Sequence, residues 1–185
     1  MHGTEAPSPW VQRWAHLITP QSAVLDLACG AGRHMQLLAA LGHRPLGVDR
    51  SPEALAAASA WGQTLQADIE SHPWPLGEQR FGAVVVTNYL WRPLWPRILD
   101  AVQQGGVLLY ETFAQGQETV GRPARPEFLL APGELLTVAA QGGLRVLAYE
   151  DGFLPAPERF VQRLVAVRER DGTSPQRWAL PATAA

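Results

Sequence analysis

Cysteine is nearly absent from this 185-residue sequence: Cys29 stands alone, so no disulfide bond can form within the chain. There is no CxxC pair and no Cys/His cluster, and we therefore expect no metal site. Nor does any apolar run approach the roughly 18 residues that a membrane-spanning helix needs. The first ten residues lack the basic stretch and apolar core of a signal peptide, so we expect a cytoplasmic protein.

Excess charge is also missing. Lys and Arg number 15 against 17 Asp and Glu, which gives a net charge of −2. Nucleic acids and anionic membranes are bound by clustered cations, so this balance argues against both as partners. Hydrophobic residues make up 46% of the chain, and a domain of this length buries roughly 70% of its unfolded surface. The chain can therefore fold without a disulfide or a metal.

Short apolar runs alternate with helical patterns along most of the chain. The runs predict strands at 23–28, 45–49, 64–67, 81–86, 107–113, 144–149 and 160–167. Helices are expected to begin near residues 9, 33, 52, 93 and 132. This alternation predicts an α/β protein with one doubly wound, mostly parallel seven-stranded sheet, a Rossmann-like fold. Because only a proline-containing turn at 152–157 separates the last two strands, we expect the last strand to run antiparallel.

The domain boundaries follow from the same pattern. We expect an N-terminal helical segment at residues 1–22, a main domain at 23–170 and a flexible tail at 171–185, which is rich in Ala and Pro. Residues 70–79 are polar and predict a loop. The loop expected at 114–126 is long for a compact domain, and loops of this length are often functional lids.

A glycine-rich turn follows the first predicted strand, in the stretch VLDLACGAGRH at 24–34. Gly30 and Gly32 allow the chain to bend sharply and a ligand to approach the backbone. The dinucleotide fingerprint G-x-G-x-x-G is broken here, because Ala28 and Arg33 occupy two of its glycine positions. A Walker phosphate loop would need Gly-Lys-Ser/Thr, which is missing.

The stretch instead resembles motif I of the class I S-adenosylmethionine (SAM)-dependent methyltransferases, with Ala28 in place of the first glycine. This resemblance implies a methyltransferase that uses SAM and releases S-adenosylhomocysteine. Within the superfamily the chain looks closest to small bacterial proteins of the tellurite-resistance methyltransferase type. That similarity rests on the segments NYLWRPL at 88–94 and YETFAQG at 110–116.

The resemblance carries three acidic positions over to the cofactor. Asp49 would bind the ribose diol, since a carboxylate can accept two charge-assisted hydrogen bonds. Asp68 and Ile69 would contact the adenine, and Asp26 would serve the methionine end; capping or solvated acids are the alternatives. The remaining expected cofactor contacts are Ala28, Cys29, Gly30, Gly32, His34, Arg50, Thr87 and Asn88. Of these, we read Cys29 as a small filler and not as a nucleophile.

The acceptor is expected near the ends of the fourth and fifth strands. Methyl transfer mainly requires the reacting atoms to be held in line, and a base is needed only if the acceptor carries a proton. Glu111 is the candidate base or orienting acid, with an ion pair to an arginine as the alternative. Tyr89 is an aromatic candidate near the sulfonium. The expected acceptor-binding residues are Trp91, Arg92, Tyr110 and Arg122.

The function expected from these residues is methyl transfer from SAM to a small-molecule acceptor. Three other functions remain open at this point: a non-catalytic SAM-binding partner or sensor, a nicotinamide-dependent oxidoreductase, and a methyltransferase acting on RNA or protein. The absence of a basic appendage makes RNA the weaker alternative. The sequence favours neither a monomer nor a homodimer.

Overall fold

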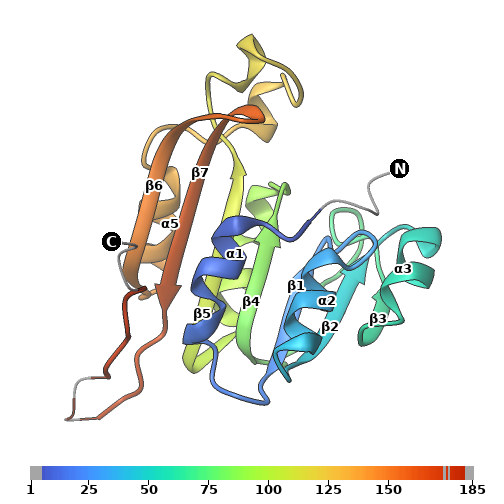
Figure 1. The fold of residues 1–185 in the computed structure, drawn as a ribbon, viewed down its shortest axis with the longest axis vertical. Helices are drawn as coiled ribbons and strands as arrows, with labels where there is room; N and C mark the ends of the chain where they lie inside the picture. Colours follow the sequence, from blue (N-terminus) through green and yellow to red (C-terminus); the bar gives the residue numbers. More distant parts are fainter. Residues whose placement is uncertain (1–5, 173, 175, 182–185) are drawn as a thin grey trace.

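A seven-stranded β-sheet forms the centre of the structure, a computed structural model that describes residues 6–172, 174 and 176–181 (Figure 1). The strand order is β3-β2-β1-β4-β5-β7-β6, and β7 runs antiparallel to both of its neighbours, β5 and β6. The strands are β1 Ala23–Leu27, β2 Arg44–Asp49, β3 Gln63–Gln66, β4 Phe81–Thr87, β5 Val102–Phe113, β6 Arg145–Pro155 and β7 Glu158–Val167. The predicted sheet, with its antiparallel last strand, is confirmed.

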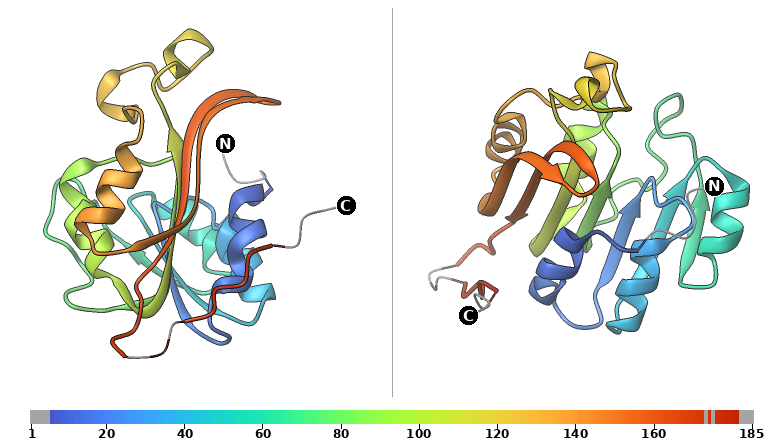
Figure 2. Two further views of the ribbon diagram at one scale, coloured as in Figure 1. Left: turned by 90° about the vertical axis from the view of Figure 1, so that its left-hand side faces the viewer. Right: turned by 45° about the horizontal axis from the view of Figure 1, so that its top comes forward.

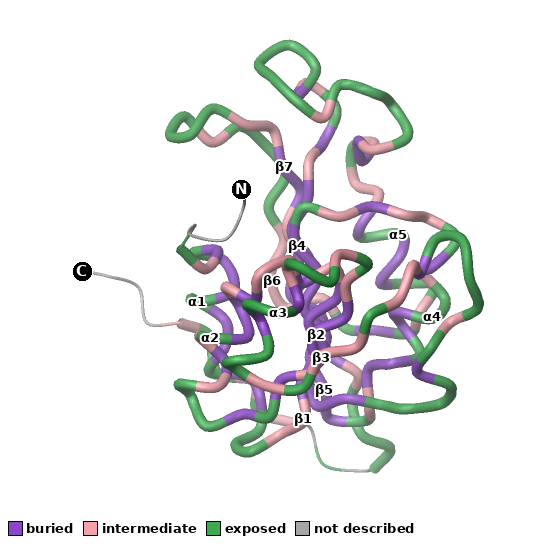
Figure 3. Tube along the Cα trace, turned by 90° about the vertical axis from the view of Figure 1, so that its right-hand side faces the viewer, coloured by how far each residue is buried: buried purple, intermediate pink, exposed green. Residues whose placement is uncertain are grey.

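Helices cover both faces of the sheet (Figure 2). The α-helices are α1 Pro9–Trp14, α2 Arg33–Ala40, α3 Pro52–Ala58, α4 Trp95–Asp100 and α5 Glu134–Gln141. On one face, Trp10 of α1 and Leu38 of α2 join a core cluster with Val85 of β4. On the other face, Ile98 and Leu135 pack on the sheet from α4 and α5. The central strand β4 is buried at all seven positions, as a strand covered on both faces must be (Figure 3).

Two helices begin as the sequence predicts, with a serine cap followed by proline. The Oγ of Ser8 accepts a hydrogen bond from the backbone N–H of Trp10 (3.1 Å), and the Oγ of Ser51 accepts one from Ala54 (3.1 Å). Proline fits at the first helical position because its fixed φ suits a helix and its missing N–H would have no partner there. These caps fix where α1 and α3 start.

The structure differs from the sequence prediction in two elements. The helix expected to run from residue 93 to Gly105 ends at Asp100, and β5 begins at Val102. A register shift between Phe81 and Ala83 accommodates residues 103–106 within β5, so the glycines there belong to a β-bulge and not to a helix end. The turn predicted at 152–157 is mostly strand, because β6 and β7 form one long hairpin that arches beyond the sheet (Figure 2).

Part of the C-terminal tail packs on the domain. Trp178 lies partly buried against the cluster of α1 and α2, and the ring Nε2 of His16 is 2.9 Å from the backbone oxygen of Ala179. The flexible tail predicted at 171–185 therefore has ordered contacts at residues 178 and 179, while residues 173, 175 and 182–185 lie outside the described part. None of the described helices is long and apolar enough to cross a membrane.

The strand order reverses between β1 and β4, which places a crevice above the carboxyl ends of these two strands. The turn after β1, the turn after β2 and the segment after β4 all open onto this edge. The long loop at 114–126, which follows β5, stands over the same edge (Figure 1). It contains two short 3-10 turns, Gln117–Thr119 and Pro126–Phe128.

Candidate functional site

The turn after β1 is held by the carboxylate that ends β2. One oxygen of Asp49 (Oδ2) accepts a hydrogen bond from the backbone N–H of Gly30 (2.8 Å), and the other (Oδ1) accepts one from Ser51 (2.9 Å). Hydrogen bonds to an ionised acceptor are the strong ones. Asp49 thus fixes the glycine turn from the neighbouring strand.

Three residues of this turn have left-handed backbone angles: Ala28 at φ 54°, Gly30 at φ 54° and Gly32 at φ 81°. A Cβ added to Gly30 would meet nothing within 4 Å, whereas one at Gly32 would lie 2.9 Å from the Cβ of Ala58. Gly30 therefore leaves open space above the turn, and Gly32 allows α2 to pack closely against α3. Ala28 holds its conformation at the cost that a side chain imposes in this region.

A small cavity of about 160 Å³ lies beside the turn, over the ends of β2 and β3. Its walls combine carboxylates with an apolar floor, and they are formed by Ala28, Val48, Asp49, Arg50, Ala67, Asp68, Ile69, Glu70 and Tyr89. One oxygen of Asp68 accepts backbone hydrogen bonds from Glu70 (3.1 Å) and Ser71 (3.2 Å), which lower the pKa of Asp68. Asp68 is thus ionised at neutral pH and carries additional lone pairs for a ligand.

A larger cavity of about 600 Å³ lies on the other side of Ala28, which lines both cavities. Its walls come from the turn, the start of α2, the end of β4 and the long loop: Ala28, Cys29, Gly30, Ala31, Arg33, His34, Thr87, Asn88, Phe113, Arg122 and Pro123. No carboxylate occurs among these described lining residues, and two arginines do. The larger cavity is therefore suited to a ligand with negative charge.

Asp26 lies buried near the end of β1, with 1% of its surface exposed. Its Oδ2 atom has no hydrogen-bond partner within the described part of the chain. Burial raises the pKa of Asp26 from 3.8 to about 7, opposed by the positive charge of Arg33 and by a hydrogen bond from the backbone of Met35. A buried, half-satisfied carboxylate is costly to folding, which is the pattern of a group retained for binding.

His34 and Cys29 are both uncharged in this arrangement. Burial, with a smaller contribution from Arg33, lowers the pKa of His34 to about 3. Its ring accepts a hydrogen bond at Nε2 from the backbone N–H of Ser8 (3.1 Å). Burial also raises the pKa of the Cys29 thiol well above its usual range. Cys29 packs with Met35 and Leu55, in keeping with the filler role predicted for it.

Glu111 does not line either cavity. Only 1% of it is exposed, its Oε1 accepts a hydrogen bond from the hydroxyl of Ser8 (2.9 Å), and its Oε2 lies 3.5 Å from Arg163. The arrangement is the arginine ion pair considered as the alternative to a catalytic base. The backbone oxygen of Glu111 accepts a hydrogen bond from the backbone N–H of Asn88 (2.9 Å), the residue after β4, which has φ 53°. This bond fixes the chain where it leaves β4.

The aromatic candidates divide between wall and core. Tyr89 lines the smaller cavity, and burial together with the charge of Glu70 raises its pKa, so the phenol stays protonated. Tyr110 is fully buried, and its hydroxyl donates a hydrogen bond to the backbone oxygen of Tyr89 (2.9 Å). Trp91 packs against the core cluster on the α4 and α5 face. Tyr89 therefore belongs to the side of the site opposite the larger cavity.

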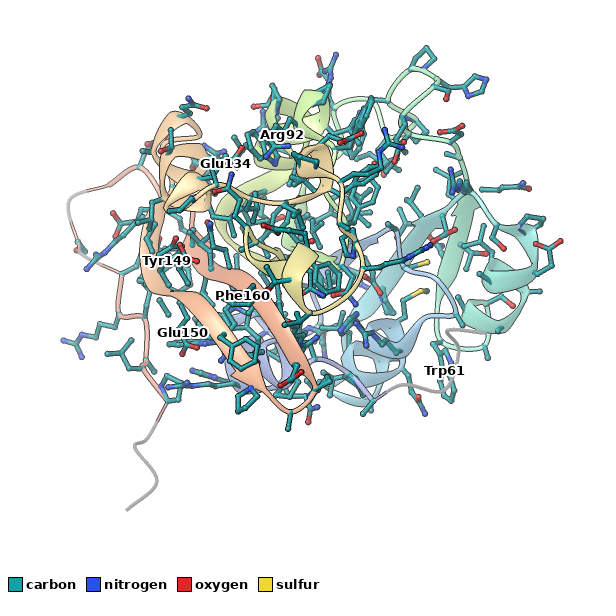
Figure 4. The ribbon with its side chains drawn as sticks, turned by 90° about the horizontal axis from the view of Figure 1, so that it is seen from above. Trp61, Arg92, Glu134, Tyr149, Glu150 and Phe160 are labelled. Atoms are coloured by element: carbon teal, nitrogen blue, oxygen red, sulfur yellow. The ribbon has the colours of Figure 1, made fainter. Side chains whose placement is uncertain are left out.

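Arg92 braces the fold instead of facing a cavity. Its guanidinium pairs with both carboxylate oxygens of Glu134 (2.7 and 2.9 Å) and donates to the backbone oxygens of Glu127 and Leu129. Figure 4 shows Arg92 and Glu134 close together. Of the four residues expected to bind the acceptor, the structure places Arg122 alone in the larger cavity.

Some wall residues were not anticipated from the sequence. Phe113 and Pro123 line the larger cavity, and Val48, Ala67 and Glu70 line the smaller one. Phe113 could have been found, since it ends the fifth predicted strand. The small and apolar residues carry no signal of their own. Within the described residues no group of three or more His, Cys, Asp and Glu side chains could hold a metal ion.

Residues 24–105 match a family model described as a methyltransferase domain. No curated protein matches the sequence. Among solved structures, TehB from Haemophilus influenzae is similar at a TM-score of 0.72 and 21% identity, covering 91% of this chain. This chain spans 64% of the length of that protein.

Two further structures are similar to this chain. A TehB-like SAM-dependent methyltransferase from Corynebacterium glutamicum has a TM-score of 0.64 at 19% identity, with 86% of this chain and 87% of that one covered. A structure described for the conversion of a disulfide bond into a thioacetal group during echinomycin biosynthesis has a TM-score of 0.65 at 20% identity, with coverage of 90% and 84%. At TM-scores of 0.64 to 0.72 and identities of 19–21%, these three similarities show a shared fold.

Proposed function

We propose that this protein is a class I SAM-dependent methyltransferase and that it transfers the methyl group of SAM to a small anionic acceptor in the larger cavity. The observation that carries the proposal is the pair of cavities that meet at Ala28: one is walled by Asp49 and Asp68, and the other by arginines without a carboxylate. A cofactor with a nucleoside and a charged amino-acid part fits such a divided site.

The residues present fit this cofactor in three respects. Asp49 and Asp68 offer carboxylates to hydroxyl and amino groups, and Ile69 offers an apolar surface to a flat ring. Gly30 leaves the space above the turn open. Asp26, two residues before Ala28, has an unpartnered Oδ2 that is available to a polar group of the cofactor. When bound, SAM would supply an electrophilic methyl group on a sulfonium, and the sulfur would leave as a neutral thioether once the methyl group has been transferred.

The acceptor is expected to arrive already deprotonated. No carboxylate lines the larger cavity within the described residues, the Nε2 lone pair of His34 is occupied by Ser8, and Glu111 is tied to Arg163. The described part of the chain thus supplies no base beside the acceptor, and its contribution is to hold and orient the nucleophile. A thiolate or a chalcogen oxyanion has a free lone pair and meets this requirement.

Arg122 is the residue proposed to select the acceptor's charge. It lines the larger cavity from the long loop, and no described group bonds its guanidinium, although Gln117 donates to its backbone oxygen (3.2 Å). A guanidinium can bind a carboxylate or an oxyanion through two parallel hydrogen bonds. A similar structure is associated with sulfur chemistry, the conversion of a disulfide into a thioacetal, and this supports a soft nucleophile.

The test compares two thiols of similar size with methyl-labelled SAM. Mercaptoacetate carries a carboxylate beside its thiol, and mercaptoethanol carries a hydroxyl there. We expect kcat/KM to be at least about tenfold higher for mercaptoacetate, which corresponds to one charge-assisted interaction. Arg122→Gln should abolish this preference without changing the affinity for S-adenosylhomocysteine. Equal rates for the two thiols in the unmodified protein would refute the anionic acceptor, and labelling of RNA or protein alone would refute a small one.

A further inference from the structure

Ser8, the residue before α1, contacts His34, which lines the larger cavity. The backbone N–H of Ser8 donates to Nε2 of His34 at 3.1 Å, and the two residues are 2% and 1% exposed. Ser8 caps α1 with its hydroxyl, so this use of its N–H is additional to the cap. A second bond joins the same two segments, since Nη1 of Arg33 donates to the backbone oxygen of Ala6 (3.3 Å).

This contact determines which ring nitrogen of His34 carries the hydrogen. A neutral imidazole has one donor and one acceptor nitrogen, and Nε2 must be the acceptor because a backbone N–H can only donate. The hydrogen therefore sits on Nδ1, which faces the hydroxyl of Thr87 at 3.5 Å. That separation is long for an N–H···O bond, so the hydrogen can be shared with a ligand oxygen in the cavity that both side chains line.

Ser8 itself is fixed by three other elements. Its hydroxyl donates to Glu111 on β5 (2.9 Å) and accepts from the N–H of Trp10 (3.1 Å). Glu111 is paired with Arg163 of β7 (3.5 Å), and the Arg163 guanidinium lies over the Trp10 ring, 4.9 Å from its centroid. The donor that reaches His34 is thus held by the paired residues Glu111 and Arg163 of the adjacent strands β5 and β7.

We propose that Ser8 is a positioning residue that fixes His34 as its Nδ1–H tautomer, so that His34 donates a hydrogen bond to an oxygen of the ligand in the larger cavity. The proposal rests on the proposed function only for the identity of that ligand. The oxygen belongs either to the carboxylate of the cofactor or to the anionic acceptor. In either case His34 serves as a donor and does not act as a base.

The tautomer is tested without any ligand, by long-range ¹H–¹⁵N NMR of the histidine rings. The chain has five histidines, and the signals absent from a His34→Asn variant identify His34. At pH 6 and pH 7 we expect a protonated Nδ1 and a pyridine-like Nε2. A protonated Nε2 in the unmodified protein overturns the proposal, whether or not the protein methylates anything.

Two substitutions at Ser8 separate its N–H from its hydroxyl. Ser8 has φ −52°, which proline can adopt, so Ser8→Pro deletes the N–H and keeps the backbone path. Ser8→Ala is the matched control, because it loses the hydroxyl and keeps the N–H. We expect Ser8→Ala to retain the Nδ1–H tautomer and Ser8→Pro to lose it. The same spectrum for both variants overturns the positioning role.

Substitutions at His34 test the donor and identify the ligand. An Asn side chain places its N–H₂ near the position of Nδ1, and a Gln side chain places it near Nε2. If the cofactor supplies the oxygen, His34→Gln weakens the binding of S-adenosylhomocysteine about tenfold, and His34→Asn weakens it less than threefold. If the acceptor supplies it, both variants bind S-adenosylhomocysteine normally and only His34→Gln raises the acceptor KM about tenfold. Equal impairment of both variants overturns the donor role.

Discussion

Replacing Asp26 by Asn is expected to stabilise the protein at alkaline pH while weakening cofactor binding. The carboxyl group of Asp26 is buried near the end of β1 with one oxygen unpartnered. Its pKa is raised from 3.8 to about 7, chiefly by burial. Ionisation above pH 7 therefore takes place in surroundings that favour the neutral form. Asn keeps an oxygen that can accept the hydrogen bond from Met35 and never ionises.

The sign and size follow from proton linkage. A folded-state pKa above the unfolded value means that stability is present below pH 4 and is lost as the pH rises through 7. A shift of about three pH units corresponds to about 4 kcal/mol at pH 8. The free energy of unfolding of Asp26→Asn should therefore exceed that of the unmodified protein by up to about 4 kcal/mol at pH 8, and the difference should vanish toward pH 4. Burial of His34, whose pKa is lowered to about 3, makes the fold less stable as the pH falls below 6.5. This effect is the same in the variant and the unmodified protein, so it cancels in the difference.

The assay is urea unfolding followed by tryptophan fluorescence at pH 5, 6, 7 and 8, with calorimetric titration of S-adenosylhomocysteine at pH 8. If Asp26 contacts the cofactor as the proposed function implies, we expect the variant to bind at least about tenfold more weakly, since it lacks the carboxylate charge. If Asp26→Asn is less stable than the unmodified protein at pH 8, the reasoning fails and Asp26 is a structural partner of α2. Greater stability with unchanged affinity would refute its ligand-facing role.

Three further outcomes are expected. Asp49→Ala removes the acceptor for the N–H groups of Gly30 and Ser51. It should lower the free energy of unfolding by about 2–3 kcal/mol and weaken the binding of S-adenosylhomocysteine about 100-fold. Its control is Ser51→Ala, which loses the α3 cap for about 1 kcal/mol and keeps affinity by titration; equal affinity loss in both would contradict the ribose role. Ala28→Gly should raise stability in urea by about 0.5–1 kcal/mol, because glycine relieves the left-handed strain at φ 54°, and a loss would show that the side chain is needed. Arg92→Ala should cost only about 1–2 kcal/mol, since its ion pair is partly exposed, and should leave acceptor KM unchanged; a raised KM would return Arg92 to the acceptor site.

The sequence was most informative where a local pattern has one physical meaning. Ser-Pro at 8–9 and at 51–52 predicted two helix starts, because the cap and the first helical residue are set within a few positions. Unbroken apolar runs predicted buried strands such as β4. The glycine turn and Asp49 were identified by their resemblance to methyltransferase motifs, and the structure joins them through a hydrogen bond from the backbone N–H of Gly30 to Asp49.

The prediction was weaker where neighbours decide the conformation. The glycines at 105 and 106 indicated a helix end, yet they lie in a β-bulge of β5, which pairing with β4 imposes. The hairpin of β6 and β7 runs through Gly152 and Pro155 because each strand supplies the other's hydrogen-bond partners. Such pairing depends on contacts between strands and is not encoded by a single segment.

For this protein, sequence alone determined the sheet type, the glycine turn after the first strand and the acids beside it, because these depend on residue type and local pattern. Tertiary structure decided which polar groups face a cavity. From sequence alone, five polar candidates were equally eligible to face a cavity. In the fold, Glu111, Arg92 and Tyr110 are bound by partners from other segments. Arg122 and His34 line the larger cavity. A side chain's role there depends on what meets it from elements that are distant in the chain, such as Ser8 against His34, and only the folded structure brings these together.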